Sequence, residues 1–174
     1  MDDYKTFANE ALEVYKSLPE ETNSIYKRRH ITLDLDLSNT SDIKDDNSVI
    51  ERIYKDSIAH LNINFDIMLG KNGIIIKNNP YIRIINNSEP EFYTILKKSM
   101  HNKLEDKYVA FTHANADKII MIDIPEGIKT GLNILFVNVN ESLPIMIYAK
   151  LGKNSEFKML QMSASNLIRM YLHQ

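Results

Sequence analysis

The chain of 174 residues carries 21 Lys and Arg against 23 Asp and Glu, and it contains no cysteine. The near balance of charge excludes the strongly basic surface of a nucleic-acid binder, and the lack of cysteine excludes a disulfide framework, a cysteine nucleophile and thiolate ligation of zinc or an iron–sulfur cluster. No apolar run approaches the roughly 18 residues of a membrane span, and residues 1–5 lack the basic start of a signal peptide, so we expect a cytoplasmic protein.

The first predicted element is an amphipathic helix that ends before Pro19. Its apolar residues recur at spacings of three and four, which places them on one face, and a proline disfavours helical geometry in the residue before it. We expect this face to dock onto the rest of the protein rather than onto a partner. The face consists of Tyr4, Phe7, Ala8, Ala11, Leu12, Tyr15 and Leu18.

A polar region follows this helix. The basic run Lys27-Arg28-Arg29-His30 is typical of a solvated surface. Residues 31–37 alternate, which places Asp34 and Asp36 on one side of a strand and the apolar residues on the other. We therefore interpret these two carboxylates as a solvated face rather than as a general acid and base, and residues 36–47 as an exposed connector.

Two further helices are predicted from their first turns. Ser48-Val49-Ile50-Glu51 and Ser88-Glu89-Pro90-Glu91 each place an acid three residues after a serine, so that both side chains can satisfy unpaired amides. Apolar residues then continue at helical spacing to Leu61 and to Leu104, respectively.

A hairpin is predicted between these helices. Residues 65–70 and 73–77 are apolar runs, and Asn72-Gly73 between them indicates a tight turn with positive φ. A third strand is predicted over residues 81–85, between two clusters of turn-forming residues.

Four short apolar strands follow at nearly even spacing, separated by Pro125-Glu126-Gly127, Gly131 and Gly152. No helix fits between them, and this spacing is typical of an all-β sandwich, barrel or solenoid rather than of βαβ units. Since neither face of the later runs is uniformly polar, we expect the strands to be covered on both sides or stacked on neighbours. The predicted strands are residues 118–124, 133–139, 144–150 and 156–162.

No chemical site is predicted. The five histidines lack the two-, three- or four-residue spacing that would place two metal ligands on one face. His60 and His101 suit helix C-termini, and His113, in the loop-like Phe111–Asn115 segment, is expected to have a structural role. A nucleophile elbow, a phosphate-binding glycine loop, a dinucleotide fingerprint and a metalloprotease helix are all missing. We therefore predict no catalytic, cofactor-binding or metal residue, no cofactor and no enzymatic activity. The histidines are His30, His60, His101, His113 and His173.

An ordered set of short segments between residues 104 and 161 resembles a known family. Residues 106–117 resemble a short element that precedes the family's first strand, residues 122–129 its Val-Pro-x-Gly-Val turn, and residues 152–156 a later Gly-containing turn. Residues 18–37 and 65–76 resemble, more weakly, its N-terminal stretch and its Asn-Gly hairpin. The family is that of the SufB/SufD core proteins of iron–sulfur cluster assembly. The chain departs from it in lacking tryptophan and in having Ala110-Phe111-Thr112 where the family has Ala-Leu-Asn.

The resemblance implies an α+β protein in which N-terminal helices with a small hairpin sheet (residues 1–105) lead into the start of a right-handed parallel β-helix (residues 106–174). It implies a non-catalytic scaffold that contacts a SufB/SufD-type subunit and a SufC-type ATPase, with no nucleic acid and no membrane. The family's cluster-related cysteine and histidine lie beyond the matched region, so no residue here inherits their roles.

Two matters stay open at the level of sequence. Family members are longer, so the chain is expected to be the N-terminal piece of a longer protein or a short relative, and an unfinished solenoid leaves an apolar end that favours self-association. The alternatives are a small-ligand β-barrel of cupin or jelly-roll type, which predicts a pocket with converging polar groups, and a structural interaction domain of unrelated role.

Overall fold

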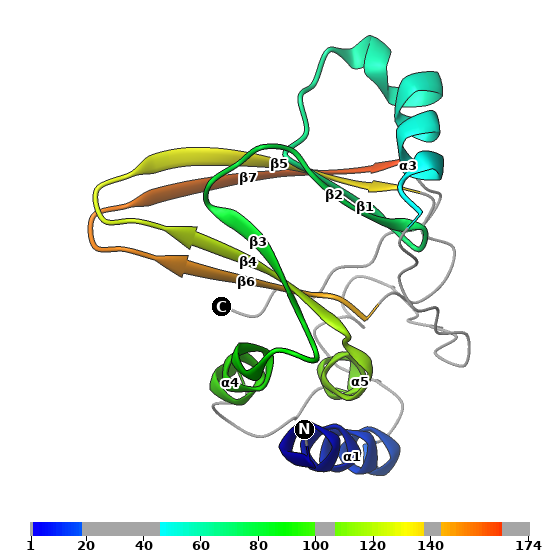
Figure 1. Cartoon of the computed structure of the whole chain (residues 1–174), viewed down its shortest axis with the longest axis vertical. Coiled ribbons are helices and arrows are strands. Elements are labelled where there is room, and N and C mark those ends of the chain that lie inside the picture. The colour runs from blue at the N-terminus through cyan, green and yellow to red at the C-terminus, as the bar shows by residue number, and fades with distance from the viewer. Residues whose placement is uncertain (1, 19–45, 100–106, 138–143, 165–174) are drawn as a thin grey trace, which may run out of the picture.

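The computed structural model describes residues 2–18, 46–99, 107–137 and 144–164. It is a mixed α and β structure in which two small mixed sheets face each other (Figure 1). Helices α1, α4 and α5 lie beyond one sheet and α3 lies beyond the other. The sheets thus form the middle layers, and both have an outer face that helices can cover.

The first sheet has the strand order β2-β1-β5-β7 and the second has the order β3-β4-β6. In each sheet the N-terminal strands form an antiparallel pair, β1 with β2 and β3 with β4, whereas β1/β5, β5/β7 and β4/β6 are parallel. The chain therefore crosses from the second sheet to the first twice, through β4–β5 and then β6–β7. Strand β6 lies parallel beside β4, and β7 lies parallel beside β5. The strands are β1 (Ile67–Gly70), β2 (Gly73–Ile76), β3 (Ile82–Asn86), β4 (Lys118–Ile124), β5 (Lys129–Val137), β6 (Met146–Leu151) and β7 (Glu156–Ala164).

The central core lies between the two sheets. Alternate side chains of β4 and β5 point into it, as the period of two in a strand requires, and Ile120, Ile122, Leu132 and Ile134 are fully buried there. The odd-numbered neighbours Ile119 and Leu135 are also fully buried, because helices cover the outer faces. Strands β4 and β5 are therefore covered on both sides. The later strands were predicted to be covered on both sides or stacked on neighbours. Strands β6 and β7 stack on β4 and β5, but they are not covered on both sides, because Leu151, Met159 and Leu160 are exposed.

Three helices cover the sheet of β3, β4 and β6. Phe7 of α1 and Phe92 of α4 are buried against Ile119 of β4, and the Tyr4 ring meets the Phe92 ring edge-on at 5.3 Å between centroids. The apolar face of the first helix thus docks on the rest of the protein, as predicted. The helices are α1 (Asp2–Ser17), α4 (Pro90–Ser99) and α5 (Lys107–Asn115).

The other sheet is covered by one irregular helical segment. Ile50 and Ile58 pack with Phe65, Met68 and Leu135 on the outer face of β1 and β5. The segment runs as α3 (Ser48–Ile53), the π-helical η1 (Tyr54–Ile58) and the 3-10 turn η2 (Ala59–Leu61), and it ends at Asn62, which has a left-handed φ of 53°.

The helices form where predicted, but their first turns are built differently. At α3, Asp46 accepts hydrogen bonds from the Ser48 hydroxyl (2.6 Å) and the Ser48 amide (3.1 Å), and the cap residue Asn47 makes no side-chain capping bond. At α4, Glu91 binds Arg83 of β3 at 2.6 Å. The prediction that Ser48 and Glu51 cap the first turn of α3 is wrong, because the neighbouring carboxylate competes for the serine hydroxyl.

The β1–β2 hairpin is confirmed, with Gly70 opposite Gly73. Its turn differs from the prediction, since neither Asn72 nor Gly73 has positive φ. Glycine is required at Gly70 for another reason. A Cβ atom there would lie 2.4 Å from the carbonyl oxygen of Val137, so the close approach of β5 excludes a side chain.

The segment before β4 is a helix and not the predicted loop. Residues 107–115 form α5, which packs on α1 and contributes the fully buried Ala110. The segment is apolar around most of its circumference, so it shows little of the one-sided periodicity from which a surface helix is recognised.

Several predictions lie outside the described residues. They concern the basic run 27–30, the strand 31–37, most of the connector 36–47, and His30, His101 and His173. The division at residues 105 and 106 stays a prediction; strands from its two sides pair with each other, β1 with β5 and β3 with β4. Within the described ranges no helix is both long and apolar enough to cross a bilayer.

Candidate functional site

The corner between β4 and β5 lies directly beside the corner between β6 and β7. The Gly127 amide donates to the Lys153 carbonyl at 3.0 Å, and the Gly152 amide donates to the Ile124 carbonyl at 2.8 Å. A Cβ atom on Gly152 would lie 2.4 Å from the Glu126 nitrogen. The contact of the two corners therefore requires glycine at position 152, and it holds β6 and β7 in register with β4 and β5.

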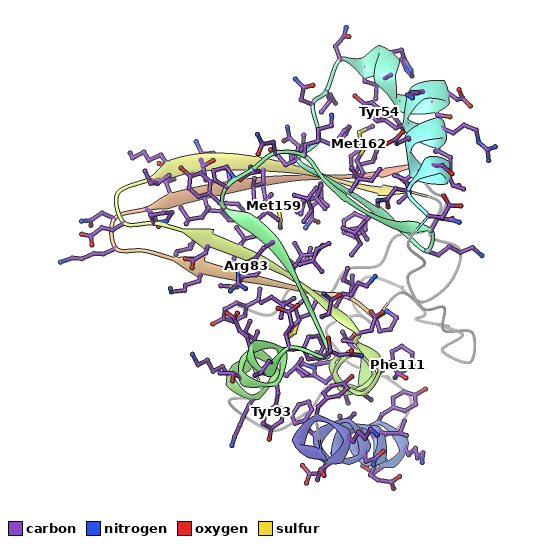
Figure 2. All side chains as sticks on the ribbon, in the orientation of Figure 1. Tyr54, Arg83, Tyr93, Phe111, Met159 and Met162 are labelled. Atoms are coloured by element: carbon purple, nitrogen blue, oxygen red, sulfur yellow. The ribbon has the colours of Figure 1, made fainter. Side chains whose placement is uncertain are left out.

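Strands β6 and β7 end their sheets on the same side of the molecule, with Met159 between the two sheets (Figures 1 and 2). We call this surface the β6–β7 end. Leu151 is 52% exposed, Met159 is 36% exposed and Leu160 is 50% exposed. They are three of the four large apolar side chains that are exposed in the described part of the chain; the fourth is Leu61. The β6–β7 end is defined by Ile147, Ala149 and Leu151 of β6 and Phe157, Met159 and Leu160 of β7.

The strand register explains why these side chains are exposed. Leu151 lies beside Ile124, and Met159 lies beside Leu132. Both neighbours are fully buried. Leu151 and Met159 therefore point into the same space between the sheets, one strand further out, where no further strand of the described chain covers them. The β6–β7 end is a cross-section of the central core.

The rim of the β6–β7 end carries charge of both signs. Lys150 of β6 contacts Asp123 at 3.5 Å, and Glu156 of β7 contacts Lys129 at 3.5 Å and Lys158 at 3.1 Å. These side chains are exposed, so each pair contributes little to the free energy of folding. The β6 edge thus carries the cation Lys150, and the β7 edge carries the anion Glu156 at the corner and the cation Lys158 two residues further along.

A separate surface recess of about 420 Å³ lies beside β3 and β4. Its charged groups are engaged in exposed ion pairs, Arg83 with Glu91 and Asp123 with Lys150. The hydrogen bond from Arg83 lowers the pKa of Glu91, which keeps this carboxylate ionised rather than poised to donate a proton. We assign no chemical role to the recess. Its lining residues are Pro80, Tyr81, Ile82, Arg83, Asp123 and Pro125.

The described histidines lie apart. His60 lies in η2, the last turn of the helical segment, as expected of a residue near a helix C-terminus. His113 is buried in α5 beside the Phe7 ring, and its Nδ1 lies 2.8 Å from the Val109 carbonyl oxygen. Since a carbonyl only accepts, this nitrogen carries the hydrogen, and the geometry is that of a satisfied core residue. No group of three or more acidic or histidine side chains in the described ranges is placed to hold a metal ion.

The sequence pattern contains only a weak signal for the β6–β7 end. Residues 144–150 are apolar on both faces, like those of a covered strand, and no periodicity distinguishes a last strand from a central one. The open edge is evident only once the strand order is known. A scan against protein-family models, a search of the curated proteins and a search of the solved structures each return no match for the chain.

Proposed function

We propose that this protein is a non-catalytic interaction scaffold whose binding surface is the β6–β7 end. One observation carries the proposal. Three of the four exposed large apolar side chains in the described ranges gather at this end, where both sheets stop. An unpaired strand edge offers backbone donors and acceptors, and exposed apolar side chains beside it mark a surface that another strand can cover.

As a narrower proposal, β4 to β7 are the first coils of a right-handed parallel β-helix, and the scaffold acts in the SUF system of iron–sulfur cluster assembly. The parallel pairing of β4 with β6 and β5 with β7, and the contact of their glycine corners, support the solenoid. The segmental resemblance to SufB/SufD proteins supports the pathway. Because the chain has no cysteine, its part would be contact with a SufB/SufD-type subunit and a SufC-type ATPase rather than thiolate ligation of a cluster.

A binding experiment tests both levels of the proposal. The purified protein would be titrated with a SufB/SufD-type subunit, with and without a SufC-type ATPase, and binding followed by calorimetry. We expect binding that Leu151→Asp abolishes, because a carboxylate would be buried in an apolar contact. Leu61→Asp is the matched control, since Leu61 is 40% exposed and belongs to η2 rather than to β6 or β7.

The outcomes separate the two levels. Absence of binding to every SUF component would contradict the proposal that the protein acts in the SUF system. Binding that is unchanged in Leu151→Asp would contradict the proposal that the β6–β7 end is the binding surface.

A further inference from the structure

We infer that the β6–β7 end takes a second copy of this chain, with β6 of each copy pairing antiparallel to β7 of the other. The inference rests on the proposed function, because it names a second copy as the occupant of the same surface when no SufB/SufD-type subunit is bound there. It follows from the direction of the two edge strands, from the backbone groups that they leave free, and from the charges at the corner.

The two edge strands run in opposite directions. Strand β6 runs toward the corner and β7 runs back from it, as Figure 1 shows. A twofold axis parallel to these strands would place β7 of a second copy beside β6, running in the opposite direction. The same rotation would place β6 of the second copy beside β7, so both sheets would continue across a symmetric contact.

The hydrogen bonds of β6 and β7 show which of their backbone groups lack a partner among the described residues. The Gly152 amide donates to β4 and the Glu156 amide donates to the chain just before β5. Backbone groups of alternate residues point to opposite sides of a strand. Even-numbered residues of β6 and β7 therefore direct these groups inward, and odd-numbered residues such as Ala149 and Phe157 direct theirs to the free edge. An antiparallel contact must then pair odd-numbered residues with odd-numbered residues.

Charge complementarity selects one register among those that pair odd-numbered residues. Pairing Ala149 with Phe157 of the second copy places Lys150 opposite Glu156 of the second copy, and the symmetry repeats this ion pair. Lys150 and Glu156 then occupy a non-hydrogen-bonded position, where opposing side chains are closest. Pairing β7 with itself around Leu160 gives neither Glu156 nor Lys158 an opposite charge. Pairing it around Phe157 would match these two charges, but only residues 156–158 of the two strands would then overlap, so the β6–β7 arrangement is favoured.

The same register matches the apolar side chains. Ile147 falls opposite Met159 of the second copy between the sheets, and Met146 falls opposite Leu160 on the outer face. Leu151 falls opposite Ser155 of the second copy, with the ring of Phe157 as its apolar diagonal neighbour on the same face. The apolar side chains at the β6–β7 end of each copy would thus be covered by the β6–β7 end of the other.

Cysteine cross-linking tests this register directly, because the natural chain has no cysteine. Lys150→Cys and Glu156→Cys proteins would be prepared separately, mixed and oxidised. Facing residues at a non-hydrogen-bonded position are about 4.5 Å apart between Cα atoms, within the range that a disulfide spans. We expect a covalent dimer in the mixture and little with either protein alone. A dimer formed by Leu160→Cys alone, without one in the mixture, would show β7 pairing with itself and overturn the inference.

Charge reversal gives an independent measurement by sedimentation equilibrium. Lys150→Glu or Glu156→Lys alone should raise the dimer dissociation constant by roughly fivefold to tenfold, and the double variant should recover most of the loss. A natural protein that stays monomeric at high concentration overturns the second-copy inference. If that monomer still binds a SufB/SufD-type subunit through Leu151, the proposed function stands without it.

Discussion

At the residue scale, glycines mark the places where backbones approach most closely. Gly70 lies against Val137 and Gly152 lies against Pro125 and Glu126. Gly131 is different, because a Cβ atom there would meet only the Lys158 carbonyl oxygen at an ordinary 3.6 Å. The first two positions therefore require glycine for packing, and the third tolerates a side chain.

Replacement of Gly152 by alanine should separate the two corners. We expect Gly152→Ala to lower the free energy of unfolding by about 1–3 kcal/mol, since the backbone must move to accommodate the added atom. Gly131→Ala should leave it unchanged or raise it slightly, because alanine restricts the unfolded chain. Urea unfolding of both variants checks this, and equal destabilisation would contradict the assigned contact.

The second residue-scale feature is the Tyr4 hydroxyl, which donates to the Ala116 carbonyl at 2.7 Å and ties α1 to the segment before β4. Burial, with a smaller effect of Asp117, raises the pKa of Tyr4. The folded state thus favours the neutral phenol. Its contribution to stability is fully present below the unfolded pKa of about 10 and is lost as pH rises through the folded pKa.

Tyr4→Phe should remove this hydrogen bond, costing about 0.5–1.5 kcal/mol near neutral pH, and should weaken the decline in stability above about pH 10. Tyr93→Phe is the control, since the Tyr93 ring packs in the same cluster and its hydroxyl makes no described hydrogen bond. Thermal unfolding across this pH range measures both. An unchanged alkaline profile in Tyr4→Phe would show that another group titrates.

At the scale of elements, one charged contact joins α4 to β3. Arg83 and Glu91 form a 2.6 Å ion pair on the surface, and the hydrogen bond from Arg83 lowers the pKa of Glu91. A lowered folded pKa means that the contribution to stability is present above the unfolded pKa of about 4.3 and is lost as pH falls through the folded value. The pair therefore adds to acid sensitivity.

Glu91→Gln should reduce the acid-dependent part of this loss while changing stability at neutral pH only slightly, because the pair is exposed. Glu10→Gln, on the exposed side of α1, is the comparison. Unfolding midpoints between about pH 3 and 7 measure both variants. If the two proteins show the same acid profile, the Arg83–Glu91 contact does not hold in solution.

At the scale of the whole molecule, helices cover the outer faces of the two sheets at β4 and β5, but in the described part of the chain the β6–β7 end leaves the layer between the sheets open. Stability should then depend on association at this end. Anything that binds only the folded state raises its apparent stability by mass action. Self-association through the exposed edge should therefore raise the melting temperature of the whole protein.

We expect the melting temperature of the natural protein to rise with protein concentration. Leu160→Asp should abolish this dependence, since it introduces a charge on the β7 edge, and Leu61→Asp should retain it. Scanning calorimetry over a hundredfold range of concentration provides the measurement. A melting temperature independent of concentration in the natural protein would argue against self-association.

Local structure was largely predictable from the sequence. The β4 strand has the predicted bounds, and the hairpin, β3 and the helices α1, α3 and α4 appear where apolar spacing indicates them. Two predictions of local structure were wrong, the capping bonds of Ser48 and the loop at residues 111–115, because hydrophobic spacing does not show such details. Asp46 displaced the expected capping bonds of Ser48, and α5 was missed because its apolar residues surround the helix.

The amino-acid sequence alone determined the hydrophobic period of every described helix and strand except α5, and the corners at Pro125–Gly127 and Gly152, because these depend on neighbours along the chain. It also excluded thiol chemistry, because the chain has no cysteine. Only the tertiary structure decided that β4 to β7 form parallel pairs in two facing sheets, and that Leu151, Met159 and Leu160 are exposed. A strand's periodicity is the same at the centre and at the edge of a sheet, so exposure depends on which strand comes next in space. The candidate site is therefore a property of strand order rather than of any single motif.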